Sequence, residues 1–89
     1  MRLRFLAAEA GDEARRVAYA IPRKLGGAVV RNRLRRRLRA AVDQVVGEMA
    51  PGAYLISPQP AALDMDFQDL IQNLRLSVRA AGAAAGDPR

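Results

Sequence analysis

The chain has 89 residues, of which 51% are hydrophobic and only four are aromatic, and it contains neither cysteine nor histidine. This length allows one domain with a modest core. The composition excludes disulfides, metal sites built from thiolates or imidazoles, and catalysis by a cysteine nucleophile or a histidine base. Fifteen Lys and Arg against nine Asp and Glu give a formal net charge of +6, which favours a polyanionic partner.

Two strands are predicted near the N-terminus. Residues 2–9 alternate between apolar and polar positions, with Phe5 on the apolar face, and residues 16–22 alternate again, with Tyr19 on the apolar face. A Gly-Asp-Glu turn signal separates the two segments. We therefore predict a β-hairpin over residues 2–22.

Two amphipathic helices are predicted in the rest of the chain. In residues 28–49 apolar side chains recur every three or four positions, and an Ala-Pro-Gly sequence ends the pattern. Residues 53–57 form a short predicted strand, followed by a proline-containing loop. The second helix is predicted over residues 67–81 with Gly82 as its C-cap, and residues 83–89 are expected to be a disordered tail.

The predicted elements follow the order β-β-α-β-α. In a small chain this order indicates an α+β fold in which two helices cover a small three-stranded sheet. The sequence has no internal repeat and no interdomain linker, so residues 1–82 are expected to form a single domain.

The positive charge is concentrated in one segment. Residues 23–39 carry eight basic side chains and no acidic one, whereas residues 40–89 carry more acids than bases. No apolar run approaches the roughly 20 residues needed to cross a bilayer, and the N-terminus lacks the apolar region of a secretory signal. We therefore expect a cytoplasmic protein with one basic patch and no membrane partner.

The basic side chains of the first helix share the face that points away from the sheet. At about 100° per residue, that face carries Asn32, Arg33, Arg35, Arg36, Arg37 and Arg39. Arg31 falls among the apolar positions, in the first turn. Charged helix faces are usually only solvated, but arginines at positions i and i+4 repel one another. A nucleic acid is therefore expected to neutralise this face, with phosphates also reaching the N–H groups at the helix start.

Other functions share parts of this pattern. A non-enzymatic RNA-binding protein, such as a small ribosomal component, would have the same basic helix. A DNA-binding module would need a helix-turn-helix partner or a dimer, and the strands on both sides of the helix argue against it, so no DNA partner is expected. Asp64, Asp66 and Asp69 could form a Mg²⁺ cluster, but Asp66 directly before an apolar-periodic run is better interpreted as an N-cap. No protein-held metal is predicted.

Residues 16–39 resemble the signature of the bacterial ribonuclease P protein subunit. The shared pattern is a strand, a basic dipeptide, a glycine loop and an Ala-Val-x-Arg-Asn-Arg sequence that opens a basic helix. The matching positions are Arg23, Lys24, Gly26, Ala28, Val29, Arg31, Asn32, Arg33, Arg36, Arg37, Leu38 and Arg39. A later Pro-Gly, a short strand and a helix starting at Phe67 also follow the family's order, so the resemblance covers roughly residues 3–80.

This resemblance implies a ribosomal protein S5 domain 2-like fold with a left-handed β-α-β crossover. It also implies a non-catalytic subunit of the endoribonuclease ribonuclease P, whose catalytic RNA removes the 5′ leader from precursor tRNA. Mg²⁺ would be held mainly by the RNA and the substrate, and no side chain of the chain would be catalytic. The RNA-binding residues would then be Arg23, Lys24, Arg31, Asn32, Arg33, Arg35, Arg36, Arg37 and Arg39.

In that family, a cleft between the sheet and an N-terminal helix holds the leader strand. The present sequence starts at the predicted hairpin, which leaves two expectations open: either its start is assigned too late, or it is a reduced variant that lacks that helix, the extra strand and with them one wall of the cleft. Phe5 and Tyr19 are the aromatic side chains left that could stack on leader bases. Their alternating positions favour a place in the core instead.

Overall fold

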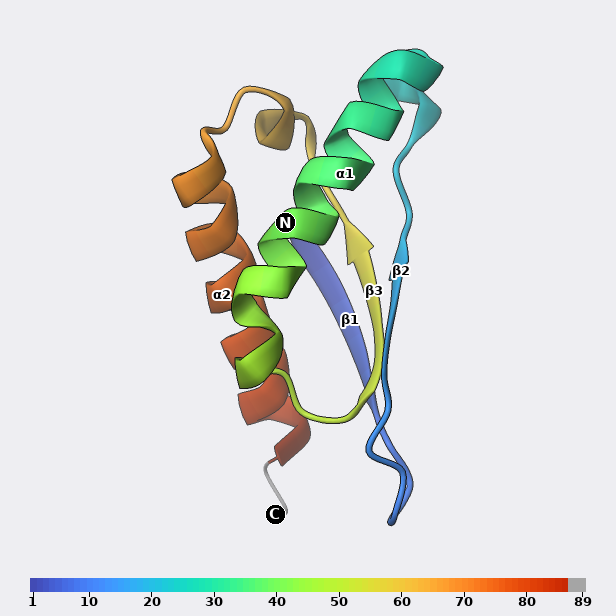
Figure 1. Ribbon diagram of the computed structural model, residues 1–89, viewed down its shortest axis with the longest axis vertical. Helices are drawn as coiled ribbons and strands as arrows, with labels where there is room; N and C mark the ends of the chain where they lie inside the picture. The colour runs from blue at the N-terminus through green and yellow to red at the C-terminus, as the bar shows by residue number, and fades with distance from the viewer. Residues whose placement is uncertain (87–89) are drawn as a thin grey trace.

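Alternating segments form three strands and apolar-periodic segments form two long helices in the computed structural model, which describes residues 1–86 (Figure 1). The elements are β1 (Arg2–Ala7), β2 (Arg15–Tyr19), α1 (Ala28–Val45), β3 (Gly52–Ser57) and α2 (Phe67–Gly86). Short 3-10 helices lie between them at Arg23–Leu25, Val46–Glu48 and Pro60–Leu63. The predicted α+β class is confirmed, and within the described residues no helix is long and apolar enough to cross a membrane.

The central strand of the sheet is β3, which lies between β1 and β2. It pairs antiparallel with β1, where Phe5 faces Tyr54, and parallel with β2, where Tyr19 faces Ile56. Because β1 and β2 do not pair, the predicted β-hairpin over residues 2–22 is wrong. β3 carries the most buried side chains of the three strands, and the central position gives its backbone polar groups partners on both edges.

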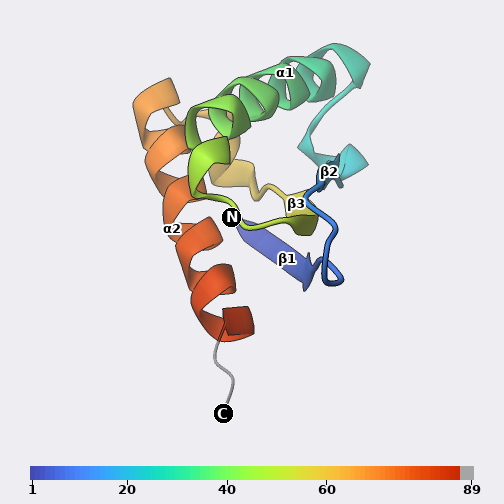
Figure 2. The ribbon, with the colours of Figure 1, turned by 60° about the horizontal axis from the view of Figure 1, so that its bottom comes forward.

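The unit β2-α1-β3 is a crossover between parallel strands. In Figure 1, α1 lies in front of the sheet, both strands run upwards, and β3 lies to the left of β2. Figure 2, turned about the horizontal axis, shows α1 above the strands, which confirms its place in front of them. The crossover is therefore left-handed, as the resemblance implied, whereas nearly all such units are right-handed.

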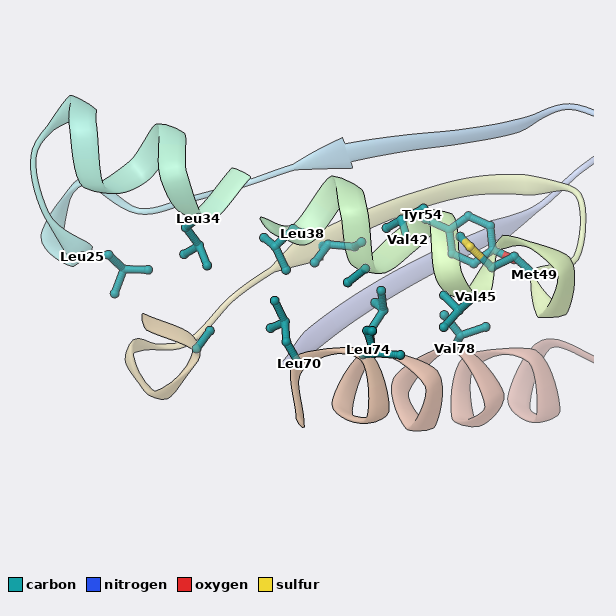
Figure 3. Close-up of a cluster of buried hydrophobic side chains, with 14 residues drawn as sticks. Leu25, Leu34, Leu38, Val42, Val45, Met49, Tyr54, Leu70, Leu74 and Val78 are labelled. Atoms are coloured by element: carbon teal, nitrogen blue, oxygen red, sulfur yellow. The ribbon is translucent and has the colours of Figure 1, made fainter. Parts of the chain in front are cut away.

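The core lies between the sheet and the two helices, and its side chains come mainly from α1, α2 and β3 (Figure 3). The stripe predicted for the first helix is confirmed from Leu34 to Val45, since Leu38 and Val45 are fully buried. It is wrong at its two ends: Val30 is 38% exposed, and the helix predicted over residues 28–49 ends at Val45, so that the buried Met49 follows a short 3-10 helix. The buried set is Leu25, Leu34, Leu38, Ala41, Val42, Val45, Met49, Tyr54, Ile56, Ala62, Leu70, Ile71, Leu74 and Val78.

The predicted end of the second helix is wrong. α2 continues through Gly82, the expected C-cap, to Gly86. Residues 83–86, expected to belong to a disordered tail, are therefore helical, and residues 87–89 lie outside the described part of the chain. The cause is the Ala-rich sequence around Gly82, because Ala is the best helix former and a single Gly costs only about 1 kcal/mol relative to it.

Candidate nucleic-acid interface

The solvent-facing side of α1 carries three arginines that are free to bind an anion. Leu34 and Leu38 on the opposite side are buried in the core, whereas Arg33, Arg36 and Arg39 are exposed. Within the part of the chain that the structure describes, these three guanidinium groups take part in no ion pair or hydrogen bond. They form the arginine face, defined here as Arg33, Arg36 and Arg39.

Two neighbouring arginines are partly occupied by the protein itself. Arg35 Nη1 donates to Asn32 Oδ1 at 2.9 Å on the exposed surface, so both side chains remain close to the arginine face. Arg31 Nε donates to the carbonyl of Gly26 at 3.1 Å and is half-buried. Arg31 therefore holds the glycine loop against the first turn of α1, and this agrees with its predicted place among the apolar positions.

The basic dipeptide lies in the short helix immediately before α1. Arg23 and Lys24 are exposed, whereas Leu25 is buried and anchors the segment in the core. Gly26, with a φ of 147°, lets the chain turn into α1, and a Cβ there would lie only 2.9 Å from Val30. The loop geometry thus brings two further positive charges to the N-terminal end of the helix that carries the arginine face.

Arg37 has a different role from its neighbours. Its Nη1 donates to the carbonyl of Ala62 at 3.4 Å, and its Nη2 donates to the carbonyl of Met65. The side chain is half-buried and ties the loop between β3 and α2 to α1. Sequence patterns do not reveal this contact, because the acceptors are backbone atoms 25 and 28 residues away. Arg37 is therefore a tether of the fold.

Replacing Arg37 by Ala is expected to lower the free energy of unfolding by about 2 kcal/mol, because two carbonyls at a partly buried site lose their donors. For a domain of this size that is a drop in Tm of about 8–16 °C. The exposed Arg36→Ala on the same helix is the control and is expected to stay within about 0.5 kcal/mol of the parent. Thermal unfolding followed by circular dichroism measures both. Equal Tm values for the two variants would show that the tether does not stabilise the fold.

The two candidate leader-binding aromatics lie on the helix-covered face of the sheet. The Phe5 ring stacks on Tyr54 with centroids 4.6 Å apart, and both Phe5 and Tyr19 are half-buried against the core. Burial raises the pKa of the Tyr19 hydroxyl; nearby Arg39 opposes the rise in this pKa and Asp43 adds to it. This placement agrees with the core interpretation of both rings.

The opposite face of the sheet is open and was not identified from the sequence. Its exposed side chains include Arg2, Arg4 and Leu6 of β1, and the register places Leu55 of β3 between Arg4 and Ala18. The face thus combines a small apolar floor with arginines at the β1 edge. Alternation alone could have indicated these residues, but only the pairing of β1 with β3 assembles them into one surface.

Two acidic residues have partners within the fold. Asp66 Oδ1 accepts hydrogen bonds from the backbone N–H of Gln68 at 2.7 Å and of Asp69 at 3.4 Å, so the predicted N-cap of α2 is confirmed. Glu48 binds Arg75, whose hydrogen bond holds the pKa of this carboxyl below its usual value. Among the residues that the structure describes, no three Asp or Glu side chains come together to hold a metal ion, so these carboxylates do not fit a protein-held Mg²⁺.

A model of the Ribonuclease P family matches residues 1–82. The chain belongs to this family. It is 46% identical over 68 residues to the ribonuclease P protein component of Symbiobacterium thermophilum, covering 75% of this chain and 59% of the relative. To the component from Brucella suis it is 40% identical over 78 residues, covering 85% of this chain and 55% of the relative. The chain thus spans less than two thirds of the length of these relatives.

Two solved ribonuclease P proteins share the fold. The protein from Thermotoga maritima superposes with a TM-score of 0.76 at 22% identity, over 88% of this chain and 74% of that one. The protein from Staphylococcus aureus superposes with a TM-score of 0.70 at 20% identity, over 84% of this chain and 69% of that one. The family resemblance read from residues 16–39 is therefore confirmed, together with the fold that it implied.

Proposed function

We propose that this ribonuclease P family chain is the protein subunit of a ribonucleoprotein endonuclease and binds the catalytic RNA through the arginine face of α1. The observation that carries the proposal is that Arg33, Arg36 and Arg39 are exposed and unpaired within the described residues, next to Arg23 and Lys24. Guanidinium groups form bidentate contacts with phosphates. Neutralising about five or six phosphates would make log K fall with log salt at a slope near −4 to −5.

We further propose precursor tRNA as the substrate, with its 5′ leader along the open face of the sheet. Arg2 and Arg4 would bind leader phosphates, while Leu6 and Leu55 offer an apolar surface to the bases. In this arrangement Leu6 and Leu55, rather than Phe5, would contact the leader bases. The reaction would be carried out in the cytoplasm by the RNA, and any Mg²⁺ would be held mainly by the RNA and by substrate phosphates.

Cleavage of precursor tRNA by a bacterial ribonuclease P RNA at low Mg²⁺ tests this function. We expect addition of the chain to raise the rate of cleavage at the mature 5′ end by about tenfold or more, equivalent to ~1.4 kcal/mol, because its arginines reduce repulsion between the phosphates of the two RNAs. The control reaction contains the chain without the RNA and should give no product. Tight RNA binding without any gain in cleavage would favour a generic RNA-binding protein instead.

A further inference from the structure

A small apolar pocket opens beside the arginine face. It has a volume of about 120 Å³ and is lined by Val30, Arg33, Leu34, Arg37 and Leu63. Leu34, at 2% exposed, is the most buried residue of the lining, whereas Val30 is 38% exposed and Leu63 is half-buried. The pocket therefore combines apolar side chains, contributed by α1 and by the segment before α2, with two arginines.

The two arginines of the pocket differ in the hydrogen bonds that their side chains make. Arg37 is held by the carbonyls of Ala62 and Met65, so its guanidinium plane is fixed and the loop that carries Leu63 stays against α1. Arg33 is exposed and makes no hydrogen bond within the described residues. No acidic side chain lines the pocket. A fixed guanidinium beside a free one suits a flat, electron-rich group that carries a phosphate.

We propose that this pocket receives one unpaired nucleobase of the RNA bound by the arginine face, an inference that rests on the proposed function. The volume is well below the ~300–1,000 Å³ of typical metabolite sites and suits a single ring system. Apolar side chains and guanidinium planes are the surfaces on which unstacked bases pack. An apolar side chain of a protein partner would fit the apolar residues, but the two arginines in the lining and the exposed Arg36 and Arg39 on the same helix favour RNA.

A base bound in the pocket would add a kind of affinity for RNA that phosphate contacts cannot supply. Phosphate binding depends steeply on salt and is the same for every sequence. A base in the pocket contributes affinity that is insensitive to salt and requires a nucleotide outside a duplex at one position. The pocket would thus set the register of the RNA on α1.

The test compares Val30→Thr with its matched control Val29→Thr, by titrating each chain with a ribonuclease P RNA over a range of salt concentrations. Val30→Thr keeps the shape of the side chain but makes one wall polar, so we expect about fivefold weaker binding with an unchanged salt slope. Val29 is 74% exposed and does not line the pocket, so its variant should bind like the parent. Equal losses of RNA affinity for the two variants, or no loss for Val30→Thr, would contradict the proposal that the pocket binds a nucleobase.

Abasic substitution of single unpaired nucleotides in the RNA gives a second readout that needs no altered protein. One abasic RNA should bind the parent chain about fivefold more weakly, and the same RNA should show no further loss with Val30→Thr. Additive losses would contradict the proposal. The Arg33→Gln/Arg36→Gln variant distinguishes failure of the pocket from failure of the proposed function. If this variant weakens RNA binding and Val30→Thr does not, the arginine face binds RNA but the pocket does not bind a base. If neither variant weakens RNA binding, the proposed function is wrong as well.

Discussion

Replacing Arg33 and Arg36 together by Gln is expected to weaken binding to a ribonuclease P RNA by roughly 100-fold, or about 3 kcal/mol, because two charge-assisted contacts to phosphates are lost. Both side chains are exposed and unpaired within the described residues, so the fold should be unaffected. The negative slope of log K against log salt should become shallower by about 2. Titration at several salt concentrations gives both quantities from one set of experiments.

The matched control for this variant is Arg75→Gln/Arg79→Gln. It removes the same number of charges from α2, where the two guanidinium groups bind Glu48 at 2.8 and 3.2 Å, and exposed ion pairs contribute little to stability. We expect its affinity to stay close to that of the parent chain. If this control lost as much RNA affinity as the α1 variant, the affinity would depend on the net charge of the chain and not on the arginine face. Arg37 is left intact in both variants, because its replacement would disturb the fold.

Replacing Gly52 by Ala is expected to lower the free energy of unfolding by about 3–5 kcal/mol. Gly52 has a φ of 150°, which other residues rarely adopt, and a Cβ there would lie 2.4 Å from the carbonyl oxygen of Leu6. Backbone strain of this kind costs about 1–3 kcal/mol, and forcing extra atoms into a packed site adds a similar amount. A small domain is stable by only about 5–15 kcal/mol, so chemical denaturation should show a large loss.

Gly47→Ala serves as the control for that experiment. A Cβ at Gly47 meets nothing within 4 Å, and its φ is not in the positive range. The substitution should therefore be neutral or stabilise the chain by about 0.4–1 kcal/mol through the unfolded state. If Gly52→Ala proved as stable as Gly47→Ala, the close approach of β3 to β1 would not constrain the residue at the start of β3.

The sequence by itself determined the features that depend on neighbours along the chain. The apolar period predicts α1 and its buried side chains such as Leu38, because the 3.6-residue repeat decides which side chains share a face. Asp66 is recognisable as a cap because the backbone N–H groups that donate to its side chain lie within three residues of it. The family is evident from the contiguous segment 16–39, and the basic character of α1 needs no tertiary information.

Only the tertiary structure decided which distant segments meet. Two alternating strands joined by a turn favour a hairpin locally, yet β3 enters between them because the central position pairs both its edges and buries its side chains. The same long-range packing distinguishes Arg37, which binds backbone carbonyls of a distant loop, from Arg33 and Arg36, which have no partner among the described residues. It also turns Phe5 towards the core and assembles the pocket at Val30. Residues identical in type thus acquire different roles, because burial and the partners supplied by other segments are set by the packing of the whole chain.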